Sequence, residues 1–179
     1  MNKVHIKDKT FEIMMPESAI LAEIDKVAAR INEDMKDKNP LFLAVLNGSF
    51  MFASDLMKRV NIPCEISFVK LSSYQGTMTT GKVKEVIGIN EDITGRHVII
   101  AEDIVESGLT MKQMMESLGT RNPASVDICS LFVKPHRLQV PLDIKYGVME
   151  IGDAFILGYG LDYDQQGRNL KDLYVVSEE

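Results

Sequence analysis

Apolar residues recur along the chain at two spacings, one typical of helices and the other of buried strands. Between Pro16 and Lys38 they return every three or four positions, which predicts a helix with one buried face. Proline suits the first turn of a helix, and Asn39-Pro40 ends the segment because the residue before a proline avoids helical geometry. The buried face is formed by Ile20, Ile24, Val27, Ile31 and Met35.

Three continuous apolar runs predict strands that are buried on both faces, as in a parallel sheet. Helices are expected near Phe50–Val60 and over Leu109–Leu118, the second closed by Gly119. Buried strands that alternate with helices favour an α/β fold, with a mostly parallel central sheet flanked by helices. The three apolar runs are Leu41–Leu46, His97–Ala101 and Ser125–Val133.

Shorter segments predict the remaining strands, and nothing in the chain suggests a second domain. A length of 179 residues without repeats or an obvious linker favours one domain over residues 1–179. Parallel sheets bind ligands in the loops beyond the carboxyl ends of their strands, so we look for functional residues there. The further strands are expected at Glu65–Tyr74 and Lys82–Ile89, and near Lys145–Glu150, Phe155–Tyr159 and Tyr174–Val176.

The composition argues against several classes of protein. Lys and Arg number 20 against 26 Asp and Glu, a net charge of −6, so nucleic-acid binding has no electrostatic support. Two distant cysteines, Cys64 and Cys129, cannot form a disulfide framework or a cysteine-based zinc site. No apolar stretch reaches the roughly 18 residues of a membrane span, and the first residues lack the apolar core of a signal peptide. We therefore expect a cytoplasmic protein with no membrane partner.

The segment Val98–Met111, VIIAEDIVESGLTM, carries the strongest chemical signal. An apolar strand delivers Glu102 and Asp103 at its carboxyl end, where carboxylates can accept hydrogen bonds from vicinal hydroxyls or bind Mg²⁺. Ser107 and Gly108 then open a helix whose first N–H groups can hold an anion. A phosphate cradle beside a pair of acids predicts a ribose 5-phosphate site.

This segment resembles the phosphoribosyl pyrophosphate signature of type I phosphoribosyltransferases, and the chain as a whole resembles their 6-oxopurine (hypoxanthine-guanine) branch. The resemblance implies a Rossmann-like fold with a small hood built from the terminal segments. It also implies transfer of a phosphoribosyl group to hypoxanthine, guanine or xanthine with Mg²⁺, in a homodimer or homotetramer. The other matching motifs are VLNGSFMFASDL, SSYQGTMTTG, SLFVKP and FILGYGLDYDQQGRNL.

The resemblance assigns roles at the phosphate-binding end. Glu102 and Asp103 match the residues that bind ribose and metal. Leu46-Asn47-Gly48 matches a pyrophosphate-binding loop with a non-proline cis peptide, and Arg168 matches an arginine that reaches pyrophosphate. Many relatives have Lys where this chain has Asn47, so its pyrophosphate binding would depend more on the metal. The 5′-phosphate would be held by Ser107, Gly108, Leu109 and Thr110.

It also assigns roles at the purine-binding end. Lys134 would donate to the 6-oxo group, Phe155 would stack on the ring, and the backbone of Ile156 would read its edge. Asp162 resembles a second metal-binding position beside the purine. Glu106 takes the place of the general base, where most relatives have Asp, and we expect it to keep that role despite its extra methylene. The mobile loop that closes over the site would begin at Ser73 and Tyr74.

Two other interpretations compete with the enzyme. The first is a regulator that binds phosphoribosyl pyrophosphate or a nucleotide without catalysis, which the substitution at Glu106 favours. The second is a phosphoacceptor receiver domain, suggested by the acid pair and by Lys134-Pro135. Receivers are shorter and carry their acid pair near the N-terminus, so the second interpretation is weak.

Overall fold

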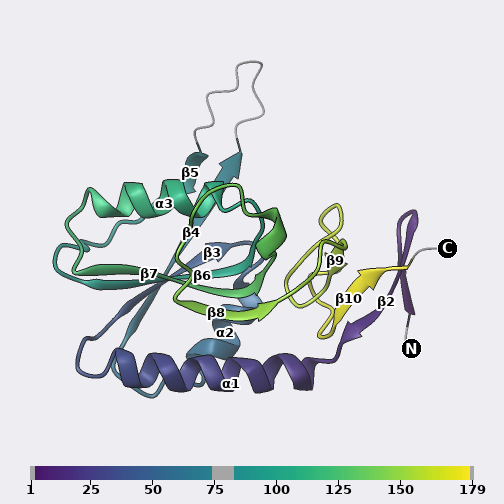
Figure 1. Ribbon diagram of the computed structural model, residues 1–179, viewed down its shortest axis with the longest axis horizontal. Helices are drawn as coiled ribbons and strands as arrows, with labels where there is room; N and C mark the ends of the chain where they lie inside the picture. Colours follow the sequence, from purple (N-terminus) through teal and green to yellow (C-terminus); the bar gives the residue numbers. More distant parts are fainter. Residues whose placement is uncertain (1–2, 74–82, 178–179) are drawn as a thin grey trace.

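The computed structural model describes residues 3–73 and 83–177, and its largest element is a six-stranded sheet (Figure 1). The strand order is β5-β4-β3-β6-β7-β8, and every neighbouring pair is parallel except β4 with β5. The largely buried strands β3, β6 and β7 are neighbours within the sheet and confirm the three apolar runs. The strands are β3 (Leu41–Leu46), β4 (Glu65–Ser73), β5 (Val83–Ile87), β6 (His97–Val105), β7 (Ser125–Val133) and β8 (Tyr146–Glu150).

Helices cover both faces of this sheet, as predicted. Helix α1 (Glu17–Asp34) and the short α2 (Phe50–Met57) lie below the sheet in Figure 1, and α3 (Leu109–Gly119) lies above it. Each face has its own apolar core: one contains Ile24 and Phe52 from α1 and α2, and the other contains Met111 from α3. Pro16 caps α1 instead of lying in its first turn, and the helix ends at Asp34, before the expected Lys38. A 3₁₀ turn, η1 (Pro135–Arg137), follows β7.

A second, antiparallel sheet joins the two ends of the chain and forms the hood that the resemblance implied. Its order is β1-β2-β10-β9, and it lies at the end of the molecule where the N- and C-terminal segments meet (Figure 1). The sequence pattern predicts no strand before residue 16, and the structure adds β1 and β2 there. The strands are β1 (Lys3–Ile6), β2 (Lys9–Met15), β9 (Ile156–Leu157) and β10 (Leu173–Val176).

Strand β6 is longer than predicted, and this changes where the acid pair lies. We expected the strand to end at Ala101, with Glu102 and Asp103 following it. Instead β6 continues to Val105, because its parallel pairing with β7 extends through Val105 opposite Val133. Glu102 and Asp103 are therefore held by the backbone of a central strand.

None of the described helices is long and apolar enough to cross a membrane.

Candidate active site

The turn after β3 lies against the acid pair of β6. The Leu46–Asn47 peptide is cis, as the resemblance implied. Gly48 is buried, and a Cβ atom on it would overlap the Asp103 carboxylate. A Cβ on Gly160, in the hood, would overlap the Gly48 carbonyl oxygen. Glycine at both positions therefore lets the β3 turn, the acid pair and the hood approach each other closely.

The two acids differ in their exposure to solvent. Glu102 is buried, with 8% of its surface exposed, whereas Asp103 is half-buried. Burial raises the pKa of Glu102 well above its ordinary value, and the negative charge of Asp103 raises it further. The Asp103 N–H donates to Glu102 Oε1 at 3.1 Å, and the Ile104 N–H donates to Asp103 Oδ1 at 2.8 Å. A bound cation would relieve the repulsion between these carboxylates.

The acid pair does not join Asp162 in one metal cluster. Among the residues that the structure describes, no group of three or more His, Cys, Asp or Glu side chains is arranged to hold a metal ion. Asp162 instead pairs with Arg168, with 2.6 Å between its Oδ1 and Nη2. The other oxygen of Asp162 accepts the Gln165 N–H at 2.8 Å. A metal at Glu102 and Asp103 would therefore need further oxygen ligands from substrate or water, which suits Mg²⁺.

The turn between β6 and α3 encloses a cavity of about 200 Å³. Gly108 caps α3 with a φ of +77°, in the left-handed region that favours glycine. Ser107 Oγ accepts the Leu109 N–H at 3.3 Å, and the Ser107 carbonyl accepts the Gln139 N–H at 3.0 Å. A helix N-terminus at a cavity of this size can receive a phosphate group. The lining residues are Glu102, Ile104, Val105, Glu106, Ser107, Gly108, Thr110 and Met111.

Lys134 connects this cavity to the segment that contains Ala154 and Phe155. It directly follows β7, and only 3% of its surface is exposed. Its Nζ donates to Glu106 Oε1 at 2.7 Å and to the Ala154 carbonyl oxygen at 3.1 Å. The Glu106 side chain keeps 47% of its surface exposed, so it remains accessible to a ligand. A buried ammonium with two acceptors is fixed in place and can still donate a third hydrogen bond.

Phe155, next to Ala154, presents an aromatic surface to solvent. It is 45% exposed although it packs against Phe11 and Tyr163 of the hood. Ile156 follows in β9, where its side chain is buried and its backbone pairs with Val175 of β10. A half-exposed ring beside a buried strand is available for stacking on a flat ligand.

The residues expected to bind pyrophosphate, Arg168 and the Asn47-Gly48 turn, are linked through Gly160. Arg168 donates from Nη1 to the Gly160 carbonyl at 2.8 Å, and the Gly160 segment contacts the Asn47-Gly48 turn. Of the two residues expected to begin a mobile loop, Ser73 ends β4, and Tyr74 lies outside the described residues.

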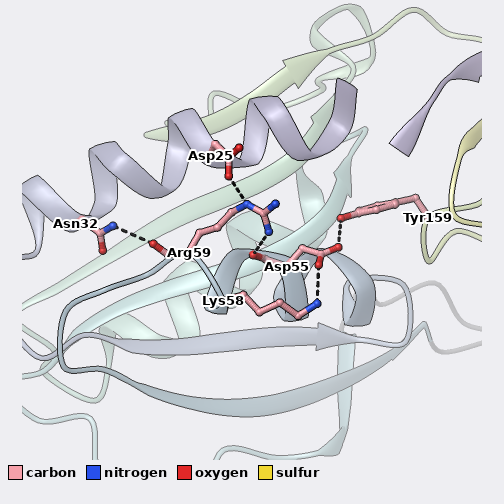
Figure 2. Close-up of polar contacts among 6 residues, drawn as sticks. All are labelled: Asp25, Asn32, Asp55, Lys58, Arg59 and Tyr159. Carbon is pink, nitrogen blue, oxygen red and sulfur yellow. Dashed lines mark hydrogen bonds and ion pairs between the residues drawn. The ribbon is translucent and has the colours of Figure 1, made fainter. Parts of the chain in front are cut away.

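Polar contacts attach the hood to α2, and the end of α2 to α1, on the lower face of the sheet (Figure 2). The hydroxyl of Tyr159, just after β9, donates to Asp55 Oδ2 on α2 at 2.6 Å. Lys58 donates to the other Asp55 oxygen at 2.9 Å, and Arg59 contacts Asp25 on α1. These contacts hold the segment that leads to Gly160 in place over α2.

Sequence reasoning missed two parts of this arrangement. The Ala154 carbonyl fixes Lys134, and a backbone acceptor leaves no signal in the residue type. Gly160 allows the hood to approach the Asn47-Gly48 turn. Its position in the FILGYG motif was visible, but only the structure shows which residue it meets.

Comparisons with known proteins agree with this geometry. Residues 15–164 match the phosphoribosyl transferase domain family. The hypoxanthine phosphoribosyltransferase of Salmonella typhimurium is 42% identical over 164 residues, which cover 90% of this chain and 92% of that protein. The hypoxanthine-guanine phosphoribosyltransferase of Streptococcus pyogenes is 36% identical over 169 residues, 94% of each chain. A structure of Trypanosoma cruzi hypoxanthine phosphoribosyl transferase aligns with a TM-score of 0.88 and 35% identity, covering 97% of this chain and 95% of that one.

Proposed function

This chain belongs to the hypoxanthine phosphoribosyltransferase family, and on that premise we propose that it makes nucleoside 5′-monophosphates for purine salvage. The reaction breaks the bond between the ribose carbon and pyrophosphate in phosphoribosyl pyrophosphate and forms a bond to a purine nitrogen. The base is hypoxanthine, guanine or both, with xanthine as a further candidate. The observation that carries the proposal is the pair of hydrogen bonds from Lys134 to Glu106 and to the Ala154 carbonyl. Glu106 lines the cavity of the β6–α3 turn, called the phosphate cavity below, and Ala154 precedes Phe155, so Lys134 joins the two. The non-catalytic regulator has no support in the comparisons.

Lys134 selects bases with an oxygen at the 6-position. Its ammonium can only donate hydrogen bonds, so it can bind a 6-oxo group but gains nothing from a 6-amino group. Adenine would place its 6-amino group, a hydrogen-bond donor, against the Lys134 ammonium. The third N–H of Lys134 would then have no acceptor. Sites built around such a hydrogen bond reject the wrong base strongly.

Glu106 acts as the general base near the purine. Its carboxylate is half-exposed at the rim of the phosphate cavity and is held by Lys134 at 2.7 Å. When the unprotonated imidazole nitrogen of the purine bonds to the ribose carbon, the proton on the other imidazole nitrogen, N7, must leave, and Glu106 accepts it. A positioned base contributes roughly 10²–10⁴-fold to a rate. Most of the remaining acceleration comes from positioning and electrostatics.

The phosphates are bound at two places. The N-terminus of α3 holds the 5′-phosphate through its free N–H groups, with Ser107 and Thr110 as hydroxyl donors. Arg168 and the backbone of the Asn47-Gly48 turn hold the pyrophosphate. Glu102 and Asp103 would hold Mg²⁺ and the ribose hydroxyls, and Asp162 would lie at a second metal position. When bound, Mg²⁺ neutralises charge that develops on the leaving pyrophosphate.

The protein forms homodimers or homotetramers in the cytoplasm. Ile66 and Phe68 are exposed on β4, and because they are two positions apart on the strand, both lie on one face of the sheet. Val69 packs in the α3-side core, so Ile66 and Phe68 face the side of α1 and α2. The first residue of α2, Phe50, is exposed as well. A second copy of this chain would cover these side chains, and sedimentation of the wild-type protein against Phe68→Lys tests this.

The activity is tested by an ultraviolet assay of the purified protein with phosphoribosyl pyrophosphate and Mg²⁺. Hypoxanthine, guanine and xanthine are offered separately, each with and without a chelator. Turnover of at least one base, abolished by the chelator and restored by added Mg²⁺, is the expected result. Absence of turnover with all three bases would contradict the proposed function.

A further inference from the structure

Three aromatic rings of the hood contact one another in a closed triangle. Phe155 meets Tyr163 edge-on, with ring centroids 5.7 Å apart and an interplanar angle of 78°. Phe11 lies 6.2 Å from Phe155 and 6.0 Å from Tyr163. These separations fall within the range in which aromatic rings attract one another in tilted and edge-on arrangements. Phe11 is fully buried and Phe155 is 45% exposed, so the triangle is anchored in the hood core and open on the side of Phe155.

The turn of the N-terminal hairpin fixes the second ring of this triangle. The Tyr163 hydroxyl donates to Asp8 Oδ1 at 2.7 Å, and Lys9 Nζ lies 5.8 Å from the centroid of the same ring. Lys7 forms an ion pair with Asp164, the residue after Tyr163. The hydrogen bond from Tyr163 lowers the pKa of Asp8, and the same bond raises the pKa of Tyr163. Asp8 is therefore a charged acceptor at neutral pH, which strengthens the contact.

The ring orientation matters because 45% of the Phe155 surface is exposed to solvent. A half-exposed phenylalanine can turn about its side-chain torsions, and ordering such a side chain when a ligand binds weakens affinity roughly two- to tenfold. Phe11 and Tyr163 pack against Phe155 before any ligand arrives, so part of that ordering is already present in the free protein. The hairpin itself reaches no part of the phosphate cavity.

We propose that the β1–β2 hairpin positions the purine-stacking ring: Asp8 holds Tyr163, and Tyr163 together with Phe11 holds Phe155 in its stacking orientation. Phe11, Tyr163 and Asp8 are positioning residues, because they act on the base only through Phe155. This inference rests on the proposed function, which supplies the role of Phe155. The N-terminal hairpin, which is far from Phe155 along the chain, therefore raises affinity for the purine. It leaves affinity for phosphoribosyl pyrophosphate unchanged.

Steady-state kinetics of the full chain test this proposal. Tyr163→Leu removes the ring, and the expected result is a five- to tenfold rise in KM for hypoxanthine with kcat and KM for phosphoribosyl pyrophosphate within twofold of wild type. Asp8→Ala is expected to raise the same KM two- to threefold, and Asp8→Asn, which keeps an oxygen acceptor, to restore it. Thr10→Val is the matched control, because it removes the His5 contact within the same hairpin without touching Tyr163.

Phe155→Leu separates failure of this inference from failure of the proposed function. If Phe155→Leu raises KM for hypoxanthine but Tyr163→Leu does not, the positioning role is wrong and the proposed function stands. Equal rises in KM for both substrates would also overturn it, because they would indicate general damage to the hood. An absence of wild-type turnover with every oxopurine would overturn the proposed function and this inference together. Circular dichroism and thermal unfolding establish that each variant is folded.

Discussion

The buried ammonium of Lys134 donates to the carboxylate of Glu106 at 2.7 Å. One partner is almost completely enclosed, and the other is half-exposed at the rim of the phosphate cavity. In the proposed mechanism, the pair joins the residue that would read the purine to the one that would remove its proton. Glu106 lines the cavity and Lys134 does not, so the hydrogen bond between them links the buried ammonium to the cavity.

Removal of the Lys134 charge should weaken use of oxopurines without unfolding the chain. Lys134→Met keeps an unbranched side chain but loses the hydrogen bonds to Glu106, Ala154 and the base. A hydrogen bond to a charged group contributes about 1.5–3 kcal/mol, which corresponds to roughly a 10- to 150-fold loss in kcat/KM for hypoxanthine. The matched control is Lys171→Met, whose lysine forms an exposed ion pair with Glu17. A loss of less than threefold in Lys134→Met would argue against its role.

Glu106 is expected to act as the base even though the family resemblance implies Asp at this position. Glu106→Gln keeps the size and a hydrogen-bond acceptor for Lys134 but cannot take a proton. We expect turnover to fall by about 10²–10⁴-fold, the range for loss of a general base. The measurement is kcat under saturating substrates at neutral pH. Unchanged turnover in Glu106→Gln would remove Glu106 from the mechanism.

Glu106→Asp tests whether the extra methylene matters in this chain. Aspartate keeps the charge but draws the carboxylate back by more than an ångström, away from Lys134. A displacement of this size can cost around a hundredfold in rate. We expect a decrease in kcat that is smaller than that of Glu106→Gln. A higher kcat in Glu106→Asp than in the wild type would contradict this expectation, because it would show that the extra methylene of Glu106 slows the reaction.

The sequence predicts the centre of the fold better than its ends. Strands β3, β6 and β7 are buried on both faces, so their apolar runs are continuous and stand out. Strand β2 is only half-buried, and its partner β10 lies about 160 residues further along the chain. Periodicity within a short window cannot register such a pairing. The extension of β6 past Glu102 was missed for a similar reason, since it depends on the register with β7.

The same contrast applies to the site. Glu102, Asp103 and the residues of the β6–α3 turn are contiguous, so their chemistry is visible in one segment. The approach of Gly48 to Asp103 joins two strands, and the contact of Lys134 with Ala154 involves a carbonyl. Neither contact depends on the spacing of residues within one segment, so neither could be predicted from the sequence pattern. The motifs that carry the family resemblance mark these segments, and the geometry gives the reason they occur together.

Gly48 should accept no larger residue. A Cβ atom there would overlap the Asp103 carboxylate, so Gly48→Ala must displace either the acid or the turn. Displacement of groups that bind pyrophosphate and metal should lower kcat/KM by at least about a hundredfold. Gly119→Ala is the control, because nothing lies within 4 Å of the added atom at the end of α3. Wild-type activity in Gly48→Ala would contradict the close approach.

The contact between Tyr159 and Asp55 should stabilise the protein in a pH-dependent way. Burial, the largest influence, raises the pKa of Asp55, but hydrogen bonds from Tyr159 and Lys58 outweigh it and hold this pKa below the ordinary 3.8. A carboxyl group whose pKa is lowered in the folded state stabilises the protein at pH values above the ordinary pKa of that group. That contribution is lost as the pH falls through the lower folded value.

Tyr159→Phe removes this bond. We expect the free energy of unfolding at pH 7 to fall by about 1–3 kcal/mol, measured by urea denaturation, with the difference from wild type narrowing below pH 3.8. Burial raises the pKa of the Tyr159 phenol far above its ordinary value, so the donor is retained at alkaline pH. Lys58→Met, which removes an exposed donor to the same carboxylate, should cost less than about 1 kcal/mol. A pH-independent difference for Tyr159→Phe would contradict the assignment.

The measurement that tests the central claim most directly compares hypoxanthine with adenine at a fixed, saturating concentration of phosphoribosyl pyrophosphate and Mg²⁺. Chromatography of the products reports which nucleoside 5′-monophosphate forms, and initial rates give kcat/KM for each base. A site in which Lys134 donates to a 6-oxo group predicts a preference for hypoxanthine of at least about a thousandfold. Comparable rates with the two bases, or nucleotide formed from adenine alone, would contradict the account.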